Sequence, residues 1–384
     1  MPMERLKPYL GIVAAVAFFA LIVIIANEVS VPQPSASRAS TASSTLSVEQ
    51  GFVLPPIPLP NLESVMSTDA ASSTPPSKKI TQFAPKSTPA LAPVPAPKPA
   101  APTVAETNSA LDIAAISLRN ALVNIICFAP ANSGLHSISG SGVFIDPKGI
   151  ILTNAHVAQY FLLADKGADC FIRAGSPAAD AYEASLIYIS PSWLKANADI
   201  LTQTLPSGTG EYDFAFLAVT KSTTSSVLPI SFPSLPLATM PRDAGTSVAI
   251  ATYGAQFLEQ SQIQSGLFPT VVFSSVKDVF TFETSTIDVL ALGGSAAAQE
   301  GSSGGGVVDV TGQMVGTITT STVTGTTDTR SLTAITASYI RAEYASETGQ
   351  ALDLLLAQPT SASIADFAPQ IPVLESIITA QLPN

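Results

Sequence analysis

Apolar and polar positions follow several different patterns along this chain, and the first predicts a membrane helix. A run of apolar residues without a charge extends from Tyr9 to Ala26, which is about the length that a membrane-spanning helix needs. Arg5 and Lys7 precede the run, which places the N-terminus in the cytoplasm. A cleaved signal peptide is the alternative, but no A-x-A-like site directly follows the run. We therefore expect residues 1–29 to form a cytoplasmic N-terminus and an uncleaved anchor.

The next segment, residues 30–107, is rich in Pro, Ser, Thr and Ala. Prolines recur throughout its stretch Pro85–Pro102, which favours an extended polyproline II conformation and excludes a packed core. The piece Phe52–Met66 is more apolar, and docking on a partner is an alternative for it. We expect the whole segment to be a disordered linker.

From residue 108 onward the pattern is that of a folded domain. A helical spacing of apolar residues comes first, with Asn108 or Ser109 available as its cap. Short β-type runs broken by Gly, Pro and Asn follow, which is typical of a barrel or a sandwich. The apolar helix positions are Leu111, Ala114, Ala115, Leu118 and Leu122. The predicted strands are 123–129, 142–145, 150–153, 169–173, 184–189, 214–219, 247–251, 270–274, 289–292, 306–310, 313–319 and 332–336.

Helices are predicted at three further places. Two are insertions between strands, one just after His156 and one near Pro191–Gln203. The last runs over roughly Tyr339–Ala357, after which Ser and Pro interrupt the pattern. We expect a folded domain over residues 108–358 and a C-terminal tail over residues 359–384, for which the pattern predicts no structure.

Charge and cysteine content limit the classes of function that are possible for this chain. The net charge of −11 excludes nucleic-acid binding through a general basic surface. The chain has two cysteines, Cys127 and Cys170, and the anchor places them outside the cytoplasm, where such a pair is a disulfide candidate. Two separate buried thiols are the alternative. Cysteines and histidines are too few and too badly spaced for a tetrahedral zinc site, and we expect neither a metal nor a cofactor.

One of the two histidines has the setting of a catalytic base. The run GSGVFIDPKGIILTNAHV predicts two strands joined by a turn at Asp146–Gly149, and the second strand ends just before His156. A histidine at a strand end, with small neighbours, can turn its ring into a cleft and act as general base and then general acid. His136 lies in a polar stretch without such a frame, and we interpret it as a surface loop residue.

An acid partner and a nucleophile follow in the order His, Asp, Ser. Asp213 opens the strand-like run DFAFLAV, and a partly buried carboxylate there needs a partner such as the Nδ1–H of His156. Ser303 is central in Gly-Ser-Ser-Gly-Gly, so it fits G-x-S-x-G and its neighbour Ser302 does not. Glycines allow consecutive N–H groups to point at one spot. We expect the N–H groups of Gly301 and Ser303 to form an oxyanion hole.

The same five residues also match the nucleophile elbow of α/β-hydrolases. In that fold the catalytic histidine follows the serine, and no histidine occurs after His156. The flanking pattern is also strand-loop-strand instead of strand-turn-helix. The sequence therefore excludes this alternative.

Taken together, GSGVFID…GIILTNAHV, DFAFLAV and EGSSGGGVVD..GQMVGT resemble trypsin-like serine proteases of the chymotrypsin clan, in particular the bacterial Deg/HtrA type. The resemblance covers about residues 122–345. It implies a mostly β fold of two six-stranded antiparallel barrels with the site between them. The anchor and linker are similar to those of membrane-tethered Deg proteases. Three features depart from the type: no PDZ domain is expected, Ser302 replaces the usual Asn, and the Cys127/Cys170 pair is atypical.

The resemblance also assigns substrate contacts. In the family, the residue six positions before the nucleophile lies at the base of the S1 pocket, and here it is Ala297. No carboxylate is present there to bind Lys or Arg, which favours a small or medium apolar P1 side chain. Thr319, Thr320 and Ser321 are expected to pair with the substrate backbone as an added strand.

These observations predict a membrane-anchored, extracytoplasmic serine endopeptidase that acts on polypeptides through an acyl-enzyme. The alternative is a catalytically silent, membrane-tethered module that uses the cleft to bind peptides or to sense them. The sequence predicts neither an oligomeric state nor a particular protein substrate.

Overall fold

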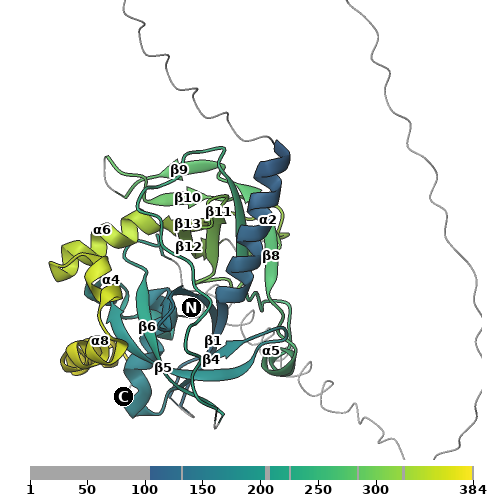
Figure 1. The fold of residues 1–384 in the computed structure, drawn as a ribbon. Coiled ribbons are helices and arrows are strands. Elements are labelled where there is room, and N and C mark those ends of the chain that lie inside the picture. The colour runs from purple at the N-terminus through teal and green to yellow at the C-terminus, as the bar shows by residue number, and fades with distance from the viewer. Residues whose placement is uncertain are drawn as a thin grey trace, which may run out of the picture. The chain divides into compact units, whose positions relative to one another are not determined.

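The computed structural model describes residues 104–130, 133–203, 208–224, 226–282, 285–321 and 325–382. They form two β-sheet halves, with one helix before the first half and several after the second (Figure 1). No helix within these ranges is both long and apolar enough to cross a membrane. The anchor predicted at residues 1–29 and most of the predicted linker lie outside the described residues.

The first half is a closed antiparallel barrel in the strand order β1-β2-β3-β6-β5-β4. Branched and aromatic side chains such as Ile125, Ile151 and Phe216 are fully buried in it, as the inward positions of a small barrel require. The first predicted six-stranded barrel is therefore confirmed. Its strands are Leu122–Phe128 (β1), Ile138–Asp146 (β2), Ile150–Thr153 (β3), Asp169–Ala174 (β4), Ala179–Ile189 (β5) and Ala215–Ser222 (β6).

The second half is a seven-stranded sheet in the order β8-β7-β11-β12-β13-β10-β9, with β8 and β9 as its two edges. The prediction of a second closed six-stranded barrel is wrong in strand number and in closure. Neither edge strand contains a fully buried residue, so neither has the inner apolar face that barrel closure needs. The strands are Ser247–Thr252 (β7), Thr270–Ser275 (β8), Asp278–Phe280 (β9), Val289–Ala291 (β10), Gly306–Asp309 (β11), Met314–Ser321 (β12) and Leu332–Thr336 (β13).

Helix α2 (Val104–Ala121) connects the halves, because it packs on β7 and β11 and then runs directly into β1 (Figure 1). Its predicted apolar stripe is buried, with Leu111 at 7% and Leu118 at 0% exposure. Leu118 occupies space that Gly306 leaves open: a Cβ at Gly306 would lie 2.6 Å from Leu118 Cδ1. The helix starts inside the last residues of the predicted linker.

Short helices lie in the connections. The two predicted insertions are present as α3 (Ala155–Ala158) with η2 (Gln159–Lys166), and as α4 (Pro191–Asn197) with η3 (Ile200–Thr202). Helix α5 (Gln260–Ser265) was not predicted, although Glu259 and Gln262 form a capping box at its start.

The C-terminal helix predicted over Tyr339–Ala357 is two helices, α6 (Ala337–Thr348) and α7 (Leu352–Ala357). Gly349 ends the first one in the left-handed region with φ 72°, a conformation that favours glycine. Helix α6 is fixed to the first barrel by Glu347. Its carboxylate accepts hydrogen bonds from the Tyr188 hydroxyl, from Ser190 Oγ at 3.0 Å and from Ser192 N at 3.0 Å.

The chain after residue 358 forms α8 (Thr360–Phe367), η4 (Ala368–Gln370) and α9 (Ile371–Thr379). Helix α8 contacts β5, and α9 contacts α4 and η2. Leu374 and Ile378 are buried, and Lys166 Nζ lies 2.9 Å from Glu375 Oε1. These helices therefore cover the outside of the first barrel (Figure 1).

The two cysteines occupy opposite positions on neighbouring strands β1 and β4, and they are joined by a disulfide. The bond closes a loop with a sequence separation of 43 residues that contains β2, β3 and the helical insertion α3–η2. It therefore encloses the whole segment that carries His156.

Replacing both Cys127 and Cys170 by Ala should lower the free energy of unfolding by about 3–4 kcal/mol, because the unfolded chain regains the entropy of the open loop. Chemical denaturation of the oxidised protein, the reduced protein and the double variant measures the loss. Equal denaturation midpoints for all three would contradict the prediction.

Candidate active site

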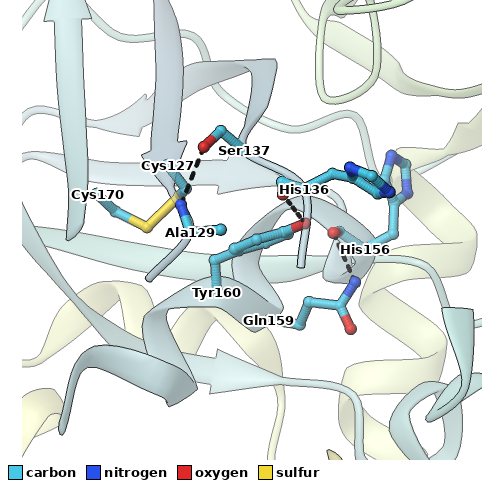
Figure 2. The surroundings of a disulfide bond; sticks show 8 residues. All are labelled: Cys127, Ala129, His136, Ser137, His156, Gln159, Tyr160 and Cys170. Carbon is cyan, nitrogen blue, oxygen red and sulfur yellow. Dashed lines mark hydrogen bonds between the residues drawn. A yellow bond between two sulfur atoms is a disulfide. The ribbon is translucent and has the colours of Figure 1, made fainter. Parts of the chain in front are cut away.

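His156 lies on the short helix α3, directly after strand β3 ends at Thr153. Asn154 has an extended backbone and occupies the N-cap position of this helix, so the chain changes from strand to helix just before His156. The carbonyl of His156 accepts a hydrogen bond from Gln159 Nε2 at 2.9 Å (Figure 2). The His156 side chain keeps 28% of its surface exposed, so a substrate can reach the ring while its backbone is held.

Asp213 is the partner of this histidine. Its Oδ2 lies 2.7 Å from His156 Nδ1, and its Oδ1 accepts a hydrogen bond from His156 N at 3.0 Å. The carboxylate is 5% exposed, and a buried charge is stable only when hydrogen bonds replace its hydration. The contact makes Nδ1 the donor, which leaves Nε2 as the basic nitrogen of the neutral ring.

A third donor to Asp213 comes from the other half of the molecule. Thr319 on β12 donates from Oγ1 to Asp213 Oδ2 at 2.8 Å. On the backbone side, Asn154 Nδ2 donates to the Asp213 carbonyl at 2.8 Å. The sequence analysis predicted only a substrate-binding role for Thr319, because a threonine in a strand carries no signal for a carboxylate partner.

The turn before β6 sets the direction of Asp213. Gly210 has a φ of 86° and Tyr212 a φ of 56°, both in the left-handed region that non-glycine residues rarely adopt. Asp213 N donates to Gly210 O at 3.2 Å, and the Tyr339 hydroxyl accepts from Tyr212 N at 3.1 Å. Burial raises the pKa of Tyr339, which keeps this hydroxyl protonated.

Ser303 lies in the tight loop that precedes β11. Gly301 and Gly304, on either side of it, have φ values of 88° and 84°. A Cβ on Gly304 would lie 1.9 Å from Ser141 O and 2.5 Å from Thr153 Oγ1, so only glycine allows this approach. The loop is therefore packed against the end of β3, the strand that leads into His156.

The neighbouring Ser302 has a different environment. It is buried at 1% exposure, and its hydroxyl donates to Thr252 Oγ1 at 3.3 Å. Ser303 is half-buried. Ser303 is therefore the more accessible of the two residues, and its role as the nucleophile stays a prediction.

Ser141 on β2 holds the serine loop at two points. Its N–H donates to Ser303 O at 2.7 Å, and its Oγ donates to Gly301 O at 2.8 Å. The same hydroxyl accepts from Tyr253 N at 2.8 Å, at the end of β7. Ser141 belongs to the first barrel, whereas its three partners belong to the second half. The sequence analysis did not identify this residue.

The peptide between Glu300 and Gly301, which carries a predicted oxyanion donor, is held by a backbone hydrogen bond. Its carbonyl accepts a hydrogen bond from Ala255 N at 2.8 Å. Because the C=O and N–H of a trans peptide point in opposite directions, the Gly301 N–H points away from Ala255. A Cβ on Gly301 would lie 2.7 Å from Tyr253 O, so this position requires glycine.

Residues 140–316 match the family described as "Trypsin-like peptidase domain", a range that includes His156, Asp213 and Ser303. This part of the chain is similar to trypsin-like peptidase domains.

Two solved structures illustrate what this chain is similar to. The active form of the Rv3671c protease from M. tuberculosis is 21% identical, with a TM-score of 0.40, and the match covers 68% of this chain and 95% of that chain. Deg5 is 16% identical, with a TM-score of 0.42, and the match covers 64% of this chain and 97% of that chain. The comparison with curated proteins finds no match.

The contact between Ser303 and His156 stays a prediction. Among the described hydrogen bonds, none joins the Ser303 hydroxyl to the imidazole. Such bonds are often long in unliganded hydrolases and shorten when substrate binds. The structure therefore brings together the predicted acid–base pair and places the serine loop beside it.

The predicted substrate contacts lie on two segments of the second half. Ala297 has no exposed surface, so a P1 side chain reaches it only after its neighbours move. Strand β12 carries Thr319, Thr320 and Ser321, and it has a register irregularity between Ile318 and Thr320 where it pairs with β13. The pocket base and the backbone-pairing strand both stay predictions.

Figure 2 relates the second histidine to this site. His136 is exposed, as expected for a surface residue, and its carbonyl accepts a hydrogen bond from the Tyr160 hydroxyl at 2.6 Å. Tyr160 lies on η2, next to the helix that carries His156, and burial raises its pKa to about 12. The disulfide and both histidines therefore belong to one connected region of the first barrel.

Proposed function

We propose that this protein is a serine endopeptidase that hydrolyses peptide bonds through an acyl-enzyme. The observation that supports the proposal most directly is the His156 Nδ1–Asp213 Oδ2 distance of 2.7 Å in a buried setting. This pair fixes the imidazole tautomer and stabilises the imidazolium that forms during the reaction. The match to the trypsin-like peptidase domain supports polypeptides as substrates.

In the proposed reaction, Ser303 Oγ attacks the carbonyl carbon of the scissile bond and its proton passes to His156 Nε2. The N–H groups of Gly301 and Ser303 stabilise the negative oxygen of the tetrahedral intermediate. The C–N bond breaks as His156 returns the proton to the leaving amine. A water molecule then attacks the acyl-enzyme by the reverse sequence and regenerates Ser303.

A fluorophosphonate probe should label Ser303, and Ser303→Ala should abolish the labelling. Ser302→Ala is the matched control and should keep it, because the Ser302 hydroxyl is buried against Thr252. Asp213→Asn should lower kcat by about 10⁴-fold, since the imidazole loses its tautomer and orientation. Labelling is read by mass spectrometry of the modified peptide, and kcat from hydrolysis of an unstructured protein.

No Ser303-dependent labelling under any condition would contradict the peptidase proposal. It would favour the catalytically silent peptide-binding or sensor module.

We further propose a small or medium apolar P1 side chain. The support is the segment Ser295–Ala298, which supplies no carboxylate at the expected pocket base. A peptide library should therefore be cut best after residues such as Ala or Val. Preferred cleavage after Lys or Arg would contradict the assignment of Ala297 to this pocket.

We propose that the protein is a single-pass membrane protein with an extracytoplasmic peptidase domain. The uncharged apolar run Tyr9–Ala26 supports the anchor, and the Cys127–Cys170 disulfide supports an oxidising compartment. Mass spectrometry of the membrane fraction should find the N-terminal peptide intact. A soluble protein whose N-terminus lies near Ser40 would contradict the anchor.

A further inference from the structure

Arg330 is a buried arginine that the proposed reaction does not use. It lies just before β13, and its residue exposure is 5%. Burial of a guanidinium costs free energy unless its N–H groups donate hydrogen bonds. The acceptors around a buried arginine therefore fix its position. The partners of Arg330 lie in two segments of the second half that lead to the oxyanion peptide.

The first partner lies before the nucleophile loop. Arg330 Nη1 donates to Ala298 O at 2.8 Å, and Ala298 is next to Ala297 at the expected base of the S1 pocket. Further order in this segment comes from Ala298 N, which donates to Ser295 O at 2.9 Å. The guanidinium thus holds the chain shortly before it reaches Glu300 and Gly301.

The second partner lies after strand β7. Arg330 Nη1 also donates to Gln256 Oε1 at 2.6 Å, and its Cζ lies 5.7 Å from the ring centre of Phe257. Gln256 directly follows Ala255, whose N–H holds the Glu300 carbonyl at 2.8 Å. The Arg330 side chain therefore joins the segment of Ala298 to the segment of Gln256. The hydrogen bond between Ala255 N and Glu300 O forms only when these two segments lie close together.

Further contacts fix the guanidinium to its own loop. Nε and Nη2 both donate to Gly325 O, at 3.2 Å and 3.1 Å. Arginine suits this arrangement because its five donors form a rigid planar fork that reaches several acceptors at once. A lysine has a charge but no such fork, and a glutamine has neither the charge nor the length.

We propose that Arg330 is a positioning residue that keeps the Glu300–Gly301 peptide in the orientation required for the oxyanion. It acts through Ala298 and through the Gln256–Ala255 segment and touches neither substrate nor the reacting atoms. The inference rests on the proposed function, because an oxyanion hole has a role only in a working hydrolase. Loss of the guanidinium removes the donor to three acceptors, Ala298 O, Gln256 Oε1 and Gly325 O, and frees the Glu300 carbonyl to turn.

The test compares Arg330→Gln with wild type in kcat, KM and the rate of fluorophosphonate labelling of Ser303. We expect kcat and the labelling rate to fall by about 100-fold, the size of effect seen when one oxyanion donor is lost. KM should change little, and the pH profile of kcat should keep its wild-type shape because the His156–Asp213 pair is untouched. Arg330→Lys should be intermediate.

Arg242→Gln is the matched control. Arg242 also joins loops through its guanidinium, with Nε 2.7 Å from Asp309 Oδ2 and Nη2 3.1 Å from Gln313 Oε1. These partners lie at the C-terminal end of β11, whereas Ser303 precedes its N-terminal end. Its loss should lower the melting temperature and leave kcat unchanged. A general loosening of the sheet would instead lower kcat in both variants.

Chemical rescue separates positioning from stability. Guanidinium at non-denaturing concentration should restore part of the lost kcat of Arg330→Ala. The kcat of Arg242→Ala should not change when guanidinium is added. If Arg330→Gln does not fold, Arg330→Lys and the rescued Arg330→Ala provide the same comparison. A folded Arg330 variant with wild-type kcat and labelling rate would overturn the inference. A wild-type protein without Ser303-dependent activity would overturn the proposed function instead.

Discussion

The candidate site depends on Ser141, because this residue connects the two halves that supply the catalytic groups. Its amide and hydroxyl hold Ser303 O and Gly301 O at 2.7 Å and 2.8 Å, and its hydroxyl also accepts from Tyr253 N. Its carbonyl accepts from Thr153 Oγ1 at 2.7 Å, at the end of the strand that leads to His156. Every polar group of one small residue is used, and the four bonds hold three segments around the site: the serine loop, the end of β7 and the end of β3.

A second connection between the halves explains why the acid can be buried. Asp213 comes from the first barrel, and Thr319 comes from the second half. The Asp213 carboxylate accepts three hydrogen bonds, from His156 N, His156 Nδ1 and Thr319 Oγ1. It has all three donors only when both halves are in place. Correct packing of the halves and formation of the acid–base pair are therefore coupled.

The sequence predicted the local features well, because alternation and glycine placement are local signals. Strands β3 and β13 have their predicted bounds, and the acid–base pair formed from two segments far apart in the chain. The three-residue strand β9 was missed, since so short a strand has no periodicity of its own. The second barrel was predicted from resemblance alone, and its closure depends on edge packing that no short motif records.

Residues that act through tertiary contacts were the main omission. Ser141, Thr319 and Arg330 occupy ordinary positions in polar or β-type runs, and their partners are far away in the chain. Ser141 lies 160 positions from Gly301, so no spacing within a motif reveals the bond. The helices after residue 358 were not predicted for a related reason. Their apolar residues pack on the outside of the first barrel, and the local sequence does not reveal that contact.

The most direct test of the whole account is an experimental structure of the protein after reaction with a fluorophosphonate. The account predicts phosphorus bonded to Ser303 Oγ, with one phosphonyl oxygen within hydrogen-bond distance of both Gly301 N and Ser303 N. It also predicts that His156 Nδ1 stays paired with Asp213 and that the Ser141 bonds persist. A probe attached elsewhere, or an adduct whose oxygen faces away from both amides, would contradict it.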